Sequence, residues 1–441
     1  MEQINWDDIV KEASIVLSEY IKINTTNPPG NERIASEFLA DVLRKEGFEP
    51  EILSFNDKRA SIVCRLAGKT SNEKPLLLLN HIDVVGANAQ DWDVDPFSGL
   101  IKDGYVWGRG AVDCKGFGIM ELMALIVLKR TKTIPKRDIV FLAVADEEAG
   151  GEAGAGWVVE NHWDKVKAGY VLNEGGMGIK DMHGKDIMMP CFGEKGPLWI
   201  KIKAKGESGH GSIPTPENPN NKLIFALDRI AKYETDIILL PEIKDMLIEV
   251  SKEIKFPIAF MMPLLLNNHF LNFNIVRKRL KRIKEINAIL RNTISITNLR
   301  SGFKENVIPS EAEAILDCRL LPGQDKDAFL KKLRKIIDNK DIILEIIQFH
   351  QPSYSNSRDK FMEVIKNVVS KNHQGIPFYP VLSSGFTDSR FFREKGAVAY
   401  GFIPCLFTQE EINTMHGVNE RISLKCLGEG IKNIFDLCCE F

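Results

Sequence analysis

The residues of this 441-residue chain that best suit a metal centre are two histidines and three carboxylates. They are His81, Asp113, Glu148, Glu174 and His416. Imidazole and carboxylate without thiolate suit zinc, with cobalt or manganese as substitutes. Such a set could hold two ions about 3.5–4 Å apart if one carboxylate bridges them, and it would support metal-assisted hydrolysis. One acid of the adjacent Glu147-Glu148 pair would then be free to act as a general base.

Short apolar runs predict the strands that would position these residues. The runs cover residues 61–66, 75–80, 138–145 and 170–173, and they alternate with helical patterns such as 116–129. Runs of this kind indicate strands buried on both faces of a mostly parallel sheet in an α/β fold. We therefore expect a mostly parallel sheet with helices around it.

The candidate residues follow these runs directly. His81 and Asp83 come after the second run, Glu147 and Glu148 after the third, and Glu174 after the fourth, while His416 lies beyond a strand expected near 397–402. In an open parallel sheet, ligands bind at the carboxyl ends of the strands. Asp113 follows Gly108-Arg109-Gly110 at the start of a helix. All of them should therefore meet at one edge of the sheet.

Each residue also has a structural interpretation. A lone histidine at a strand end is more often a hydrogen-bonded structural residue than a ligand, and Glu147-Glu148 could be a solvated turn. Asp113 could simply favour a helix N-terminus. Burying several carboxylates together is, however, prohibitively costly without a cation. Their joint convergence favours a metal site.

Two rival motifs fit the sequence less well. His81, Asp83 and His416 could form the facial triad of a non-haem iron oxygenase, but Asp113, Glu147, Glu148 and Glu174 would then be unexplained. The glycine-rich stretch 150–156 lacks the Lys-Ser/Thr of a phosphate-binding loop. We expect only a loop entering a helix there.

The length and the change of pattern near Gly196 indicate two domains. Beyond it we expect a strand at 198–205, a helix at 221–232, strands at 293–299 and 311–321, a helix at 326–337 and a strand at 342–349. This β-α-β-β-α-β order is typical of a ferredoxin-like layer. An insertion at about 239–290, basic and helical at its end, interrupts it. We expect a catalytic domain of residues 1–195 and 353–441 around an inserted domain of residues 196–352.

Composition excludes some partners and indicates a compartment. A formal net charge of −2 gives no reason to expect nucleic acid or an anionic membrane. The first residues show no secretory signal, and the apolar run 256–266 is too short to span a bilayer. Eight cysteines form no CxxC spacing and no disulfide framework. We therefore expect a cytoplasmic protein without disulfides.

A series of motifs in order resembles the zinc-dependent aminoacylase, carboxypeptidase S and succinyl-diaminopimelate desuccinylase family of metallopeptidases. The motifs are Asn80-His81-Ile82-Asp83-Val84-Val85, Gly108-Arg109-Gly110-Ala111-Val112-Asp113, Asp146-Glu147-Glu148, Asn173-Glu174-Gly175-Gly176, Gly209-His210-Gly211-Ser212, Asn306-Val307-Ile308-Pro309, Asp317-Cys318-Arg319 and Met415-His416-Gly417. Each is a weak signal alone, but eight in the family's order are strong.

The resemblance implies a role for each metal-site residue. Asp113 would bridge two zinc ions, with His81 and Glu174 completing one site and Glu148 and His416 the other. Asp83 would orient the imidazole of His81. Glu147 would be the general base, and the peptide bond after Asp113 would be cis.

The resemblance also implies how the substrate is held. His210 would stabilise the oxyanion, in many relatives within the site of the partner subunit, so the resemblance implies a homodimer. Asn306 and Arg319 would bind the substrate carboxylate, and Gly385 and Thr387 would lie in a substrate loop, although Phe386 stands where small residues are commoner. From the sequence alone, His210 could equally be a surface loop residue and Arg319 a partner in a structural ion pair.

We therefore expect a dizinc hydrolase of N-acyl amino acids or small peptides with a free carboxylate, of the carboxypeptidase, dipeptidase or aminoacylase type. The inserted domain would act as a lid and dimerisation domain. The clamp of Asn306 and Arg319 argues against a strict aminopeptidase, and the complete site argues against a non-catalytic ligand-binding relative. The apolar stretch 256–273 could line an acyl pocket or form a core or subunit contact.

Overall fold

The chain forms two compact units. The computed structural model describes residues 4–70, 72–182, 184–251 and 265–441. Unit 1 consists of Met1–Phe192, Ser355–Val381 and Thr387–Phe441, and unit 2 of Gly193–Tyr354 and Leu382–Phe386. Each unit is described by itself below.

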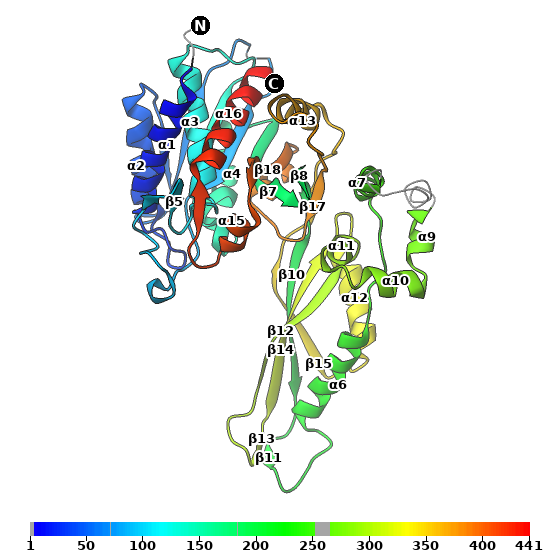
Figure 1. Cartoon of the computed structure of the whole chain (residues 1–441). Helices are drawn as coiled ribbons and strands as arrows, with labels where there is room; N and C mark the ends of the chain where they lie inside the picture. Colours follow the sequence, from blue (N-terminus) through cyan, green and yellow to red (C-terminus); the bar gives the residue numbers. More distant parts are fainter. Residues whose placement is uncertain (1–3, 71, 183, 252–264) are drawn as a thin grey trace. The chain divides into compact units, whose positions relative to one another are not determined.

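A mostly parallel sheet organises unit 1 (Figure 1). In spatial order its strands include β1 (Glu51–Ser54), β2 (Ala60–Leu66), β6 (Ile139–Val144), β3 (Leu76–His81), β7 (Tyr170–Met182) and β18 (Val398–Phe407). The pairs β6–β3, β3–β7 and β7–β18 are parallel, whereas β1–β2 and β2–β6 are antiparallel. Every residue of β3 and β6 is buried, as their continuous apolar runs predict. The expected α/β class is confirmed.

Helices cover both faces of this sheet. On one face α1 (Trp6–Ile21), α3 (Lys115–Arg130) and α16 (Leu424–Glu440) pack together, and α3 rests on β3 and β6. On the other face, Leu77 and Leu79 of β3 join the side chains of α4 (Trp157–Asn161), α5 (Trp163–Val166) and α14 (Ser389–Glu394) in one apolar cluster. The alternation of side chains along each strand lets one strand serve both layers.

The other elements of unit 1, together with the short strands where the chain passes between the units, are short or peripheral. They are α2 (Glu32–Lys45), η1 (Ala89–Asp91), β4 (Ile101–Lys102), β5 (Tyr105–Trp107), η2 (Glu147–Ala149), η3 (Glu152–Gly156), β8 (Lys185–Met189), β9 (Cys191–Glu194), β16 (Ser353–Tyr354), α13 (Lys360–Asn372), β17 (Val381–Ser383), α15 (Gln409–Thr414) and β19 (Arg421–Ser423). The glycine-rich stretch 150–156, expected as a loop, contains the helical segment η3 and leads into α4.

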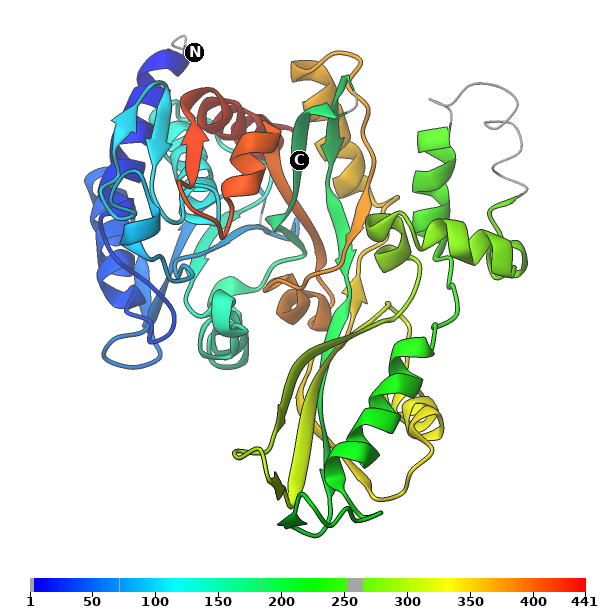
Figure 2. The same ribbon diagram turned by 60° about the horizontal axis from the view of Figure 1, so that its bottom comes forward.

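Unit 2 is built on a four-stranded antiparallel sheet. Its elements follow in the order β10 (Gly196–Lys205), α6 (Pro219–Lys232), β12 (Thr293–Ser301), β14 (Glu311–Leu320), α12 (Lys326–Ile337) and β15 (Ile342–Phe349). The strand order is β12-β14-β10-β15. Helices α6 and α12 lie side by side (Figure 2, green and yellow) and share an apolar core with the sheet. The β-α-β-β-α-β element order that the sequence predicts is present.

The insertion in unit 2 is helical where the structure describes it. It contains α7 (Pro241–Ser251), α9 (Asn268–Leu271), α10 (Asn274–Leu280) and α11 (Lys284–Ile289). Half of the apolar stretch, residues 256–264, lies outside the described residues. Of the rest, Leu266 and Leu271 are buried, whereas Phe273 is half exposed.

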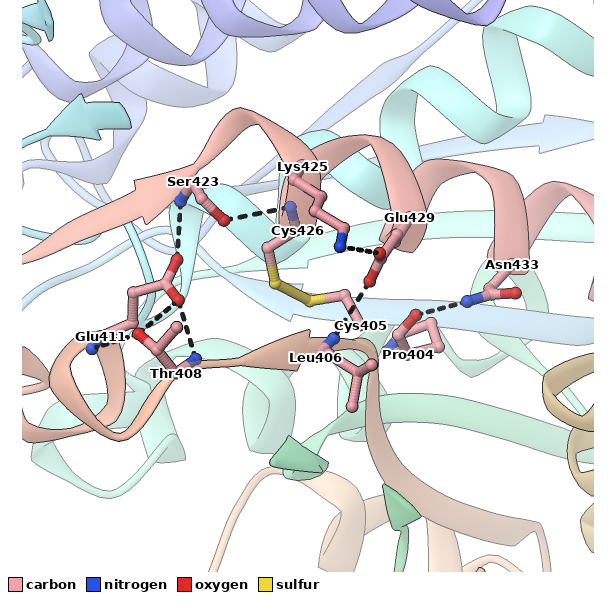
Figure 3. Close-up of a disulfide and its surroundings, with 10 residues drawn as sticks. All are labelled: Pro404, Cys405, Leu406, Thr408, Glu411, Ser423, Lys425, Cys426, Glu429 and Asn433. Atoms are coloured by element: carbon pink, nitrogen blue, oxygen red, sulfur yellow. Dashed lines mark hydrogen bonds and ion pairs between the residues drawn. A yellow bond between two sulfur atoms is a disulfide. The ribbon is translucent and has the colours of Figure 1, made fainter. Parts of the chain in front are cut away.

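A disulfide joins Cys405 of β18 to Cys426 of α16 (Figure 3). The expectation of no disulfide was wrong, because spacing along the chain did not reveal this pair: the fold brings residues 21 positions apart to a Cα–Cα distance of 5.2 Å. The disulfide closes a loop that carries His416. Ser423 ties the same loop a second time, because its backbone N–H donates to Glu411 at 2.8 Å.

Within the described ranges, the helices are all too short or too polar to cross a bilayer.

Candidate metal centre

Adjacent strands of unit 1 deliver the expected ligands to one edge of the sheet. His81 is the last residue of β3, and Glu148 lies in the η2 turn that follows β6. Glu174 lies in β7, which pairs with β3. His416 lies between α15 and β19. The ligands therefore follow or end neighbouring strands of the sheet, as the sequence predicts.

The five expected ligands meet around Asp113. His81 Nε2 lies 3.0 Å from Asp113 Oδ1, and His416 Nε2 lies 3.0 Å from Asp113 Oδ2. Glu174 Oε1 is 3.6 Å from His81 Nε2, and Glu148 Oε1 is 3.4 Å from His416 Nε2. Each oxygen of Asp113 therefore faces one histidine, and each of these histidines lies near one further carboxylate, which is the arrangement that a bridging ligand needs.

The donor set fits cations. His81, Asp113 and Glu148 offer ligand atoms that all lie within 4.8 Å of one another. Oε1 of Glu148 is buried and accepts no hydrogen bond from any described residue, so a lone pair remains for an ion. Imidazoles and carboxylates at such distances are typical ligands of divalent metals.

Burial and mutual repulsion shift the pKa values of these groups strongly. Contact with the carboxylate of Asp113, and then with that of Glu148 at 3.4 Å, raises the pKa of His416 to about 10. Burial, followed by the charge of Asp113, raises the pKa of Glu174 to about 7. Burial opposes ionisation of Asp113, but hydrogen bonds from His416 and His81 outweigh it and hold the pKa of that carboxyl well below its usual range. In the ion-free protein, bound protons therefore balance the negative charge of the carboxylates, as cations would.

Glu147 has the environment of a general base. Burial, followed by repulsion from Glu174, raises the pKa of Glu147 well above its usual range. It is next to the ligand Glu148 but belongs to neither group of clustered ligand atoms among the described residues. A carboxylate of raised basicity beside a metal centre can accept and return a proton.

Asp83 positions the turn that carries Glu147 and Glu148. Its Oδ1 accepts from the backbone N–H of Glu147 and its Oδ2 from that of Glu148, both at 3.1 Å. Asn27 donates to Oδ2 at 2.8 Å. Nδ1 of His81 lies 2.9 Å from the backbone carbonyl oxygen of Asp83 and 3.5 Å from its Oδ1.

This placement of Asp83 argues against the iron triad. Asp83 faces Nδ1 of His81, whereas Asp113 and Glu174 face Nε2 on the other edge of the ring. One ion could not therefore be bound by Nε2 of His81 and by the carboxylate of Asp83.

Glu420 holds the loop of Asp113, a role that the sequence analysis missed. Glu420 is fully buried. Its Oε1 accepts from the backbone N–H groups of Val112 at 2.8 Å and Asp113 at 3.0 Å. Its Oε2 pairs with Arg109 Nη1 at 2.6 Å. The peptide bond between Asp113 and Cys114 is cis, as the resemblance implies.

Two residues of the site have left-handed backbone conformations. Asp146 has φ 74° and His416 has φ 57°. A non-glycine residue in this region costs on the order of 1–3 kcal/mol and persists only where its surroundings fix it. Asp146 is fixed by Arg59 Nη1 at 2.7 Å and by the N–H of Ala153 at 2.8 Å. The turn after β6 thereby points Glu147 and Glu148 into the centre.

Two further residues at the centre escaped the sequence analysis. Cys114, directly after Asp113, shares a group of ligand atoms with His81 and Glu174. Asp388 is buried, and neither of its carboxyl oxygens has a hydrogen-bond partner among the described residues. Burial raises the pKa of Asp388 to about 8. In both cases adjacency to a named motif residue, Asp113 or Thr387, was a usable signal.

The residues expected to bind the substrate lie partly in unit 2, where His210 and Asn306 are neighbours. His210 in β11 (Gly209–His210) pairs with Val307 in β13 (Val307–Ile308). The N–H of Gly211 donates to the carbonyl oxygen of Asn306 at 2.8 Å. Asn306 and His210 are both exposed.

Arg319 lies at the opposite end of the unit 2 sheet. It stands near the end of β14, and the eight residues that separate it from Glu311, at the strand's start, span about 26 Å. Its Nε and Nη2 donate to the carboxylate of Asp317, at 2.7 and 3.1 Å, and Phe386 lies over its guanidinium at 5.5 Å. Asn306 and Arg319 of one chain are thus not a single clamp.

The substrate loop divides between the two units. Thr387 is buried, and its Oγ1 accepts from Asn173 Nδ2 at 3.2 Å, so its hydroxyl contacts the residue before Glu174. Gly385 is exposed in unit 2, where its N–H donates to Ser383 Oγ at 3.0 Å.

Comparison with known proteins gives four matches, all to peptidases or to enzymes of N-acyl amino acids. The model of peptidase family M20/M25/M40 matches residues 77–439. The human N-fatty-acyl-amino acid synthase/hydrolase PM20D1 is 30% identical over 380 residues, covering 84% of this chain and 75% of that protein. A probable carboxypeptidase S-like 2 of Dictyostelium discoideum is 27% identical over 406 residues, covering 86% and 77%. The crystal structure of an M20 family metallo-carboxypeptidase, Sso-CP2 of Sulfolobus solfataricus, has a TM-score of 0.74 at 21% identity, covering 97% and 98%.

Proposed function

The chain belongs to peptidase family M20/M25/M40, and from this premise we propose that it cleaves N-acyl amino acids or small peptides that carry a free carboxylate. It is an enzyme that hydrolyses amide bonds. The observation that carries the proposal is the meeting of two histidines and three carboxylates around Asp113.

We propose that each ligand belongs to one of two ions. Asp113 would bridge them, His81 and Glu174 would complete one site, and Glu148 and His416 the other. Two zinc ions, with cobalt or manganese as substitutes, would supply Lewis acid catalysis by polarising the amide carbonyl and the attacking water. The fit of the donors supports this assignment.

Glu147 would move the proton. Its carboxylate takes a proton from the attacking water and returns it to the nitrogen of the leaving amine. The raised pKa of Glu147, caused first by burial, suits both halves of this transfer. The carboxylate of Asp83 accepts hydrogen bonds from the backbone N–H groups of Glu147 and Glu148, and so it holds the turn that carries the base.

Substrate binding would need residues from two chains. We propose that Arg319 binds the carboxylate, and that His210 and Asn306 act together in a site of a second copy. Their separation along β14 supports this division. Asp317 holds the guanidinium of Arg319 by two of its nitrogens, while Nη1 has no hydrogen-bond partner among the described residues and could bind a carboxylate. Gly385 and Thr387 would contribute the loop beside it, and unit 2 would act as lid and dimerisation domain.

Complementation tests the shared site. Chains with His210→Ala and chains with Glu147→Gln should each be inactive. Mixed dimers should regain activity, because one of their two sites would combine an intact Glu147 with an intact His210. Absence of recovery in a verified heterodimer would show that the site is completed within one chain.

The proposal does not specify the length of the substrate's acyl group. The human relative PM20D1 is an N-fatty-acyl-amino acid synthase/hydrolase. The apolar insertion has Phe270 and Phe273 among its described residues. It could contact the fatty-acyl chain of such a substrate, or it could form a subunit contact. Rates across N-acyl chain lengths decide, since a pocket predicts rising kcat/KM with longer apolar chains.

A cytoplasmic location would require Cys405 and Cys426 to be reduced there, because persistent disulfides are rare in reducing compartments. We propose a cytoplasmic location, in which cellular reductants would open the disulfide that the structure shows. Thiol labelling of the protein taken directly from its cells tests it, and a fully blocked pair would place the protein in an oxidising compartment.

Metal analysis combined with a substrate panel tests the function as a whole. The purified chain should hold two divalent ions and hydrolyse N-acyl amino acids or dipeptides, and a chelator should abolish turnover. Failure to bind ions, or equal turnover of substrates whose free carboxylate is amidated, would refute the proposal.

A further inference from the structure

Cys114 places a thiol among the ligand atoms of the centre. Its sulfur, a ring nitrogen of His81 and a carboxylate oxygen of Glu174 lie within 4.8 Å of one another. Three ligand atoms grouped in this way could hold one metal ion. Cys114 is completely buried.

The other free cysteines do not share this position. Like Cys114, the cysteines at 64, 191, 318, 438 and 439 are not part of the disulfide: they are Cys64, Cys191, Cys318, Cys438 and Cys439. In the part of the chain that the structure describes, Cys114 is the one cysteine that joins a group of clustered ligand atoms. Its placement beside two expected ligands is therefore specific to this residue, rather than a consequence of general cysteine burial.

The backbone fixes Cys114 on both sides. Asp113, before it, donates its N–H to Glu420 at 3.0 Å. The carbonyl oxygen of Cys114 accepts from the N–H of Gly118 at 2.9 Å, within the first turn of α3. These hydrogen bonds fix the backbone at Cys114, and its completely buried side chain places the sulfur beside His81 and Glu174.

We propose that Cys114 Sγ is a further metal ligand, bound to the ion that His81 and Glu174 hold. This inference rests on the proposed dimetal centre. On binding, the S–H bond breaks, its proton leaves to solvent, and the sulfur donates a lone pair to the ion. No oxidation or reduction is involved.

A sulfur ligand changes the expected metal preference. Carboxylates and imidazoles alone would admit manganese, whereas a thiolate favours zinc, cobalt or cadmium. The site that contains Cys114 should therefore discriminate against manganese more strongly than the site of Glu148 and His416. Replacing Cys114 by serine should narrow this difference.

Cobalt substitution provides the test. The complete chain, loaded with two Co²⁺ ions, should show a near-ultraviolet sulfur-to-cobalt charge-transfer band. Cys114→Ser and Cys114→Ala should lose the band and should bind one ion at least about tenfold more weakly, since even partners outside the ligand shell are worth roughly 10–100-fold. Cys64→Ala, a buried cysteine elsewhere in the sheet, should keep both the band and the affinity.

The outcomes separate this inference from the proposed function. If two cobalt ions bind and the wild-type chain shows no charge-transfer band, Cys114 is not a ligand while the dimetal centre stands. If no ion binds, the proposed function itself fails. If the variants of Cys114 do not fold, absence of the band from the wild-type chain still overturns the inference. A band that survives in folded Cys114→Ala would assign the sulfur to another residue and overturn the inference.

Discussion

The carboxylate of Glu420 accepts a hydrogen bond from the backbone N–H of Asp113 at 3.0 Å. The acid that holds Asp113 in place thus comes from the same disulfide-closed loop as His416, which faces the other side of that aspartate. The loop between Cys405 and Cys426 therefore both supplies one ligand and positions another.

Removing Glu420 should damage both stability and metal binding. Glu420→Ala leaves Arg109 buried without its partner, and breaking a buried ion pair costs about 3–5 kcal/mol. Thermal unfolding and metal content measure the two effects. Glu410→Gln is the matched control, because the exposed pair of Glu410 with Arg421 should contribute at most about 1 kcal/mol. Equal effects of the two variants would contradict the role of Glu420.

Glu147→Gln should remove the base while keeping the ions. The amide has the size of the carboxyl group but cannot accept the proton, so kcat should fall by about 10²–10⁴-fold. Metal content should stay at the wild-type value. Glu160→Gln, on the exposed surface of α4, serves as the control. A fully active Glu147→Gln enzyme would remove Glu147 from the mechanism.

Asp83→Asn should loosen the turn after β6. The carboxylate accepts from the N–H groups of Glu147 and Glu148 and from Asn27, and an amide replaces one of its acceptor oxygens by a donor. We expect metal affinity to fall about 10–100-fold, as for other residues that orient ligands. Competition with a chelator measures the affinity. An unchanged value would show that the turn keeps its geometry without Asp83.

Metal binding should release protons and strengthen as the pH rises. In the ion-free protein, hydrogen bonding to Asp113 raises the pKa of His416 from 6.5 to about 10, so the imidazole is protonated at neutral pH and an ion must displace that proton. Affinity should therefore increase with pH up to about 10. Calorimetry in buffers of different ionisation enthalpy counts the protons. Binding without proton release would mean that His416 is neutral before the ion enters.

The raised pKa of His416 has the opposite consequence for folding stability: the ion-free protein should become less stable as the pH rises. A histidine whose pKa is raised on folding stabilises the folded chain fully below pH 6.5 and loses that contribution as the pH rises towards 10. Unfolding curves of chelator-treated protein across this window should show it.

Reducing the Cys405–Cys426 disulfide should destabilise unit 1 and loosen His416. Closing a loop of this length stabilises a protein by roughly 2–4 kcal/mol. Cys405→Ser should lower the melting temperature and weaken binding of the ion held by Glu148 and His416. Cys438→Ser, a buried free cysteine on α16, is the control. If reduction changes neither quantity, Glu411 and Ser423 alone hold the loop.

The sequence determined the sheet and its ligands because both depend on local patterns. Short continuous apolar runs bounded by turn residues indicate strands buried on two faces, and residues that follow them are expected at the strand ends. His81, Glu148 and Glu174 could therefore be placed without coordinates. The β-α-β-β-α-β order of unit 2 was readable for the same reason.

Only the tertiary structure decided which distant segments contact one another. The contacts of Glu420 with Asp113, of Asp83 with the turn at Glu147, and of Cys405 with Cys426 join segments separated by 21 to more than 300 positions, and no periodicity encodes such pairings. The separation of Asn306 from Arg319 likewise follows from the length of β14 rather than from any motif. Hydrogen bonds and sulfur contacts require positions fixed to within an ångström, which packing of the whole chain provides.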